Sequence, residues 1–180
     1  GVIGIILGIW IIASSIFSIK INYNKYNLKN FFRYNNSLIA HIGVGIVILG
    51  ITFSTIFKIE NNFNLRVDEK ISFGSYSLEL DEIVLKKKKN YQELVGNFLL
   101  FKNDKFIANI KPGKRYYFTT KIITTEAGIH HDLLQDFYII LGDEIEDEWK
   151  IKMYQNPLVS FIWLGIIVMI SSGIIGVLKK

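Results

Sequence analysis

The sequence contains no cysteine and only two prolines among its 180 residues. The absence of cysteine excludes a disulfide framework, a thiolate metal site and a cysteine nucleophile. Acidic residues are missing from both ends of the chain, because all 16 lie between Glu60 and Glu148. A chain with this uneven distribution of charge is neither a single water-soluble globule nor an acidic disordered protein.

The net charge of +5 comes from the ends of the chain. Residues 58–157 contain 15 basic and 16 acidic residues. The six other basic residues lie beside apolar runs: Lys20, Lys25, Lys29, Arg33, Lys179 and Lys180. Basic residues in such positions set membrane topology. The isoelectric point near 9.2 therefore does not indicate a surface that binds DNA or RNA.

Three apolar runs are long enough to cross a membrane. Residues 1–19 and 158–178 carry no charge, and residues 38–57 contain one ionisable residue, His41. About 20 mostly apolar residues span the hydrocarbon core, so we predict three transmembrane helices. Residues 1–19 lack the basic start and the small-residue cleavage site of a signal peptide. Because the first residue is not Met, we expect the C-terminal piece of a longer protein or a processed product.

The basic residues also predict the orientation of the spans. The loop 20–37 has four basic and no acidic residues, and the chain ends in Lys179 and Lys180. Both belong on the cytoplasmic side, or the matrix side in a mitochondrion. Three spans then place residues 58–157 on the opposite side of the membrane.

Residues 58–157 show the pattern of short strands. Apolar and polar residues alternate in 76–81, 106–110 and 150–154, and turn residues such as Gly74 and Pro112 separate the runs. We predict a small antiparallel barrel or sandwich with a modest core of its own. For residues 126–135 the pattern leaves a short helix and a loop both open.

His41 is the first candidate for chemistry. An ionisable residue inside a membrane helix is costly to bury and marks a functional site by default, and a neutral imidazole is a good ligand of haem iron. The bland alternative is a histidine near the helix end that reaches interfacial water or a neighbouring helix. Gly43, Gly45 and Gly50 follow at spacings that let another helix or a flat cofactor approach the backbone.

Other polar residues are weaker candidates for a functional site. We expect His130 and His131 to lie in a surface loop, with a weak metal site that includes Asp132 as the alternative. Residues 86–89, four lysines, are typical of a solvated hairpin tip. Lys114, Arg115 and Glu126 fit either a buried Glu–Arg pair or a contact to an external carboxylate. No nucleotide-binding, zinc-protease or serine-hydrolase motif is present, so the chain does not read as an autonomous enzyme.

Four stretches together resemble the C-terminal portion of the CcmF family, membrane subunits of the cytochrome c haem lyase. Residues 37–43 are similar to the family's Leu-Ala-His-x-Gly, and residues 112–117 to its Pro-x-Lys-Arg-x-Tyr. Residues 125–127 resemble its Thr-Glu-Ala. Residues 154–165 resemble its Pro…Trp-Ile-Trp-x-Gly, with Phe161 where the family often has Trp.

The resemblance implies a function that the residues alone do not. In the family the histidine that corresponds to His41 is an axial ligand of a membrane-embedded haem b, and its partner histidine lies in an earlier helix. The implied partners are the N-terminal portion of the same subunit, a CcmE-like haem chaperone, apocytochrome c and a CcmH-like thiol-handling protein, besides the lipid bilayer. His130 and His131 match no ligand position of the family.

The expectation is therefore the C-terminal part of a haem lyase, inactive without its N-terminal portion. Its membrane would be the bacterial inner membrane, with residues 58–157 in the periplasm, or alternatively the mitochondrial inner membrane. The rival hypothesis is a membrane-anchored β-domain that scaffolds an assembly and holds no cofactor.

Overall fold

The computed structural model describes residues 1–22 and 28–178, which form two compact units. The helical unit comprises residues 1–58, 132–135 and the chain from Asn156 onward. The second unit comprises Ile59–His131 and Asp136–Gln155. Lys25, Lys179 and Lys180, three of the basic residues used to orient the spans, lie outside the described residues.

The helical unit contains α1 (Val2–Asn22), α2 (Leu28–Ile56) and α3 (Val159–Val177). Each includes a stretch long and apolar enough to cross a membrane, as predicted: Val2–Ile21, Tyr34–Ile56 and Val159–Val177. However, α2 begins within the segment 20–37 that we expected to be a loop. The residues between Leu28 and Ser37 contain neither proline nor glycine, so nothing in them ends a helix before the apolar run.

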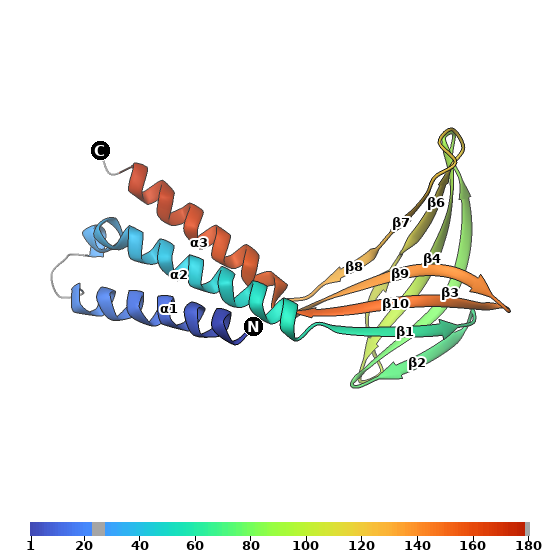
Figure 1. Cartoon of the computed structure of the whole chain (residues 1–180), viewed down its shortest axis with the longest axis horizontal. Coiled ribbons are helices and arrows are strands. Elements are labelled where there is room, and N and C mark those ends of the chain that lie inside the picture. The colour runs from blue at the N-terminus through green and yellow to red at the C-terminus, as the bar shows by residue number, and fades with distance from the viewer. Residues whose placement is uncertain (23–27, 179–180) are drawn as a thin grey trace. The chain divides into compact units, whose positions relative to one another are not determined.

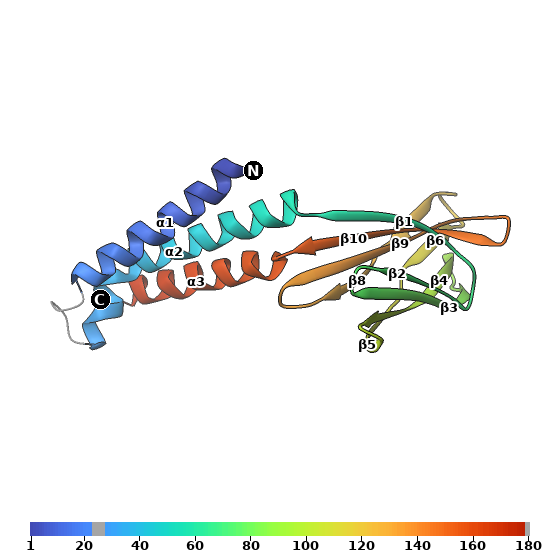
Figure 2. The same cartoon turned by 90° about the horizontal axis from the view of Figure 1, so that it is seen from below.

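The three helices lie side by side in the two views of Figures 1 and 2, and α2 packs against both α1 and α3. Glycines allow this close approach. A Cβ atom added to Gly43 would lie 2.8 Å from the carbonyl oxygen of Gly165 on α3. One added to Gly45 would lie 2.9 Å from the carbonyl oxygen of Gly8 on α1. Small residues at helix contacts are the usual basis of packing in membranes.

The second unit is an antiparallel β-sandwich, one of the two predicted architectures. One sheet has the order β1-β10-β9-β8, and the other has the order β2-β3-β4-β6-β7, with β5 also paired to β4. The strands are β1 (Ile59–Leu65), β2 (Glu69–Phe73), β3 (Tyr76–Lys87), β4 (Tyr91–Lys102), β5 (Lys105–Ile110), β6 (Gly113–Tyr117), β7 (Ile123–Glu126), β8 (Gly128–His131), β9 (Gln135–Ile145) and β10 (Glu148–Pro157).

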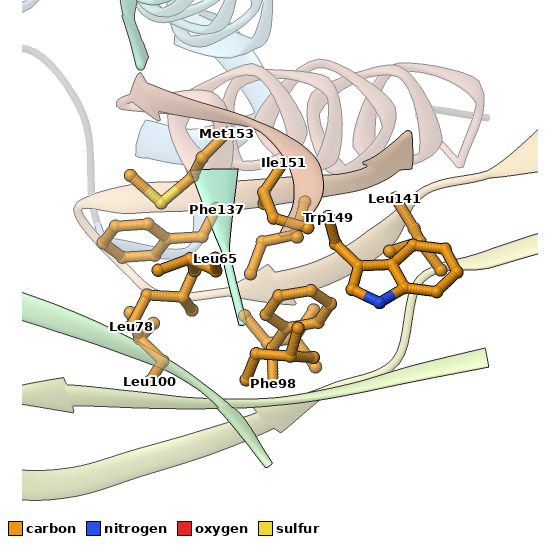
Figure 3. Close-up of a cluster of buried hydrophobic side chains, with 12 residues drawn as sticks. Leu65, Leu78, Phe98, Leu100, Phe137, Leu141, Trp149, Ile151 and Met153 are labelled. Atoms are coloured by element: carbon orange, nitrogen blue, oxygen red, sulfur yellow. The ribbon is translucent and has the colours of Figure 1, made fainter. Parts of the chain in front are cut away.

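The core of the sandwich lies between the inner faces of the two sheets (Figure 3). Phe98 and Leu100 of β4 face Phe137 of β9 and Ile151 of β10, and all four are at most 2% exposed. This burial explains the alternation in the sequence, because every second residue of a strand points to the same face.

Two details of the sandwich differ from or add to the sequence prediction. Residues 126–135 are neither a short helix nor one loop: they contain the end of β7, the strand β8 and a turn before β9. At each flank, consecutive strands belong to different sheets, since β1 is followed by β2 and β7 by β8. The chain therefore passes from one sheet to the other on both sides of the core.

Candidate functional site

The imidazole ring of His41 is hydrogen-bonded to the backbone of its own helix, α2. Its Nδ1 atom lies 2.6 Å from the carbonyl oxygen of Ser37, one turn earlier. A carbonyl oxygen only accepts, so Nδ1 carries the proton and Nε2 keeps its lone pair. Metal-binding histidines commonly donate their second N–H to a carbonyl in this way. The side chain is exposed on the surface of the helical unit, where an outside group can reach it.

The glycines after His41 are explained by helix packing. Gly43 and Gly50 are covered by α3, and Gly45 by α1. An added Cβ at Gly50 would lie 2.9 Å from the backbone nitrogen of Ile162. Of the two uses that the spacing allowed, the approach of another helix is thus the one these three positions serve, and they give no separate support for a flat cofactor.

Arg115 joins the two sandwich motifs that the sequence analysis singled out. On β6 its Nε donates to Glu93 Oε1 of β4 at 2.7 Å, and its guanidinium lies 3.0 Å from Glu126 Oε1 of β7. The hydrogen bond to Glu93 is the main reason that the pKa of Arg115 is raised. Arg115 and Glu126 therefore form a pair, although both side chains remain partly exposed. This favours a structural clamp between neighbouring strands over a free cation.

Lys114 forms a second ion pair, with Asp143 of β9. The bond from Lys114 is the main cause of the lowered pKa of the Asp143 carboxyl. Beside it is a pocket of about 290 Å³, lined by Leu85, Gln92, Leu94, Lys114, Arg115, Tyr116 and Ile123. Lys114 and Arg115, the two cationic residues that line the pocket, already contact carboxylates. The pocket therefore presents a mainly apolar and aromatic surface.

The two adjacent histidines lie on strand β8, which corrects the loop expected from the sequence. His131 Nδ1 contacts Asp136 Oδ2 at 2.7 Å, and the ring of His130 stacks on Phe137. Among residues 1–22 and 28–178 no group of three or more His, Asp or Glu side chains is placed to hold a metal ion. The alternative of a weak metal site with Asp132 therefore finds no support there.

Sequence reasoning missed the acidic partners of these groups. Glu93, Asp136 and Asp143 each pair with a residue that the sequence did single out. Glu93 is a direct cross-strand partner of Arg115 in the β4–β6 register. That register depends on how the sheet is assembled and leaves no short-range signal in the sequence.

Three apolar helices with an antiparallel sandwich between the second and third define a membrane-anchored β-sandwich protein. Residues 56–157 match the family model described as the CcmF C-terminal beta-sandwich. This match covers more than half of the chain, and the chain belongs to the CcmF family, of which it represents a C-terminal portion.

Bacterial relatives agree with this assignment. The chain is 33% identical over 138 residues to the cytochrome c-type biogenesis protein CycK of Rhizobium meliloti, covering 76% of this chain and 20% of the relative. It is 29% identical over 139 residues to CcmF of Haemophilus influenzae, covering 77% and 22%. It is 26% identical over 175 residues to CcmF of Escherichia coli, covering 97% and 27%. The chain thus spans about a fifth to a quarter of these relatives.

A solved structure shares the fold. The chain named cytochrome c heme lyase CcmF superposes with a TM-score of 0.72 over 89% of this chain and 28% of its own length. At 12% sequence identity this likeness concerns the fold alone. The apolar helices and the bacterial relatives together support an inner-membrane protein.

Proposed function

We propose that this chain is the C-terminal part of a membrane haem lyase subunit for cytochrome c maturation, and that His41 supplies one axial ligand of a transmembrane haem b. The single observation that carries the proposal is the bond from His41 Nδ1 to the Ser37 carbonyl, which leaves Nε2 of the exposed imidazole as the nitrogen that could bind a metal. The names of the relatives and of the solved structure support the biogenesis role.

The fit rests on the chemistry of the imidazole. The Ser37 carbonyl favours the tautomer with the proton on Nδ1 and limits rotation of the ring. The exposed position of His41 leaves room for a large planar group and for a second ligand from a part of the subunit outside this chain. A bis-ligated haem supplies one-electron transfer, so the task of His41 is to hold and tune a redox centre. Acid–base catalysis is not required of it.

The β-sandwich has a different part in the proposal. We place it on the periplasmic side of the inner membrane, where the haem chaperone, apocytochrome c and the thiol-handling partner would meet. Arg115, Glu93 and Glu126 would then keep β4, β6 and β7 in register beneath this surface. The whole subunit would be needed for activity, since the chain covers only about a quarter of its relatives.

An optical experiment tests the ligand role. The complex that contains this chain would be purified from membranes, and reduced-minus-oxidised spectra and pyridine haemochrome content would be recorded for wild type, His41→Ala and Val44→Ala. Val44 is the matched control because it is also exposed on α2 and lies one turn further on. We expect the b-type signal to fall at least tenfold in His41→Ala and to stay unchanged in Val44→Ala.

Two results would contradict the proposal. An unaltered b-type spectrum in His41→Ala would remove the axial-ligand role, and a wild-type complex without haem would favour the cofactor-free scaffold. Equal loss of signal in both variants would point to a folding defect, which the amount of intact complex on a native gel would reveal.

A further inference from the structure

The turn between β8 and β9 has an unusual composition. Residues 132–135 close this hairpin, with the backbone N–H of Asp132 donating to the carbonyl of Gln135 at 3.2 Å. Its two central residues are Leu133 and Leu134, which are 71% and 61% exposed. Hairpin tips that face water favour Gly, Asn, Asp and Pro. Two exposed leucines at a tip therefore need a separate explanation.

Four other described turns of the sandwich follow the usual rule. Gly, Ser, Asn, Asp, Glu or Lys occupies the central positions of the turns at 74–75, 88–90, 103–104 and 146–147. Exposed apolar residues also occur in the β1–β2 turn, at Val67, and between β6 and β7, at Phe118 and Ile122. The β8–β9 turn differs in having two adjacent leucines at its central positions.

The β8–β9 turn belongs to the helical unit, and it is fastened to the start of α3. The backbone N–H of Leu158 donates to the Leu134 carbonyl at 2.8 Å, and Ser160 Oγ donates to the Asp132 carbonyl at 3.0 Å. These two bonds hold the turn at the level of the first turn of α3. Val159 is the first residue of a helix long and apolar enough to cross a membrane, so we expect the boundary of the hydrocarbon at this level.

Trp163, within the first two turns of α3, is 64% exposed. Tryptophan is enriched at the membrane–water interface, so its position agrees with a boundary at this end of the helix. We propose that Leu133 and Leu134 insert into the lipid bilayer beside α3, so that the β8–β9 turn is a membrane-inserted anchor. The occupant is lipid, because the two exposed leucines are uncharged and their turn is bonded to the start of a helix that is apolar enough to span a membrane.

Spin labelling tests this proposal directly, because the chain has no cysteine of its own. Single-cysteine variants Leu133→Cys and Leu134→Cys would be spin-labelled in the full chain in lipid vesicles. Accessibility to oxygen and to a water-soluble nickel complex would be measured by continuous-wave EPR. Ile167→Cys, exposed in the middle of α3, is the lipid reference. Ser75→Cys, exposed in the β2–β3 turn, is the near-isosteric aqueous reference.

The two probes distinguish the occupants. We expect labels at positions 133 and 134 to be more accessible to oxygen than to the nickel complex, as at Ile167 and opposite to Ser75. High accessibility to the nickel complex would overturn the proposal by placing the turn in water. Low accessibility to both reagents would overturn it by showing that protein covers the leucines. None of these outcomes depends on haem, so the test is independent of the proposed function.

Discussion

At the scale of single residues, the two histidines with a hydrogen-bonded ring differ in their partners. His41 has its Nδ1 engaged by a backbone carbonyl and is exposed, whereas His131 is engaged by the buried carboxylate of Asp136. The first arrangement holds an exposed imidazole on a helix that is apolar enough to cross a membrane. The second ties a histidine to its neighbouring strand.

Asp143 gives a residue-scale prediction about pH. Its folded-state pKa lies below the ordinary 3.8, chiefly because of the bond from Lys114. The ion pair therefore stabilises the fold above the unfolded-state pKa, and the stabilisation is lost as the pH falls through the lowered folded-state value. In Lys114→Met we expect the pKa of Asp143 to rise toward 3.8, measured by NMR titration of the carboxyl carbon.

Lys150→Met is the matched control for that titration. Lys150 acts on Asp143 only through charge and is the smallest of the causes. Its replacement should raise the pKa of Asp143 less than Lys114→Met does. An equal or larger rise in Lys150→Met would show that the Lys114 bond does not dominate.

At the scale of elements, apolar run length predicted the three spans, and alternation predicted an antiparallel barrel or sandwich, of which the sandwich is observed. Both patterns follow directly from burial in lipid or in a two-sheet core. The start of α2 at Leu28 and the strand β8 were not predicted. A polar helix end carries no hydropathy signal, and a strand of four residues depends on its partner β9 more than on its own sequence.

The contact between α2 and α3 gives an element-scale prediction. Gly43→Ala would place a Cβ 2.8 Å from the Gly165 carbonyl oxygen, so one helix must shift. We expect this change to destabilise the helical unit by about 1–3 kcal/mol, the usual cost of overpacking. Unfolding in mixed detergent micelles, followed by the loss of helical circular dichroism, measures it.

Gly173→Ala provides the comparison on α3. No atom lies within 4 Å of a Cβ built at Gly173, so alanine fits there. Alanine is also the better helix former by roughly 0.5–1 kcal/mol. Stability should therefore be unchanged or slightly higher, and comparable destabilisation by the two variants would contradict the packing argument.

At the scale of the whole molecule, the charge distribution predicts the orientation of the chain in the membrane. The distribution of basic residues predicts that the sandwich and the start of α2 lie on opposite sides of the membrane. A membrane-impermeant maleimide should label Ser75→Cys in cells whose outer membrane alone is permeable. Ser37→Cys, exposed near the start of the α2 span, should react only after the inner membrane is opened. The reverse pattern would invert the orientation.

The passage of the chain between sheets at both flanks of the sandwich has a consequence for assembly. Three of the four strands at the ends of the two sheet orders, β2, β7 and β8, are only four or five residues long, and the fourth, β1, has seven. Short edges present few free backbone groups to an incoming strand, which protects a sheet against uncontrolled polymerisation. We therefore expect partners of this domain to recognise it mainly through side chains and turns, so that surface substitutions would change its specificity without disturbing the hydrogen bonds between strands.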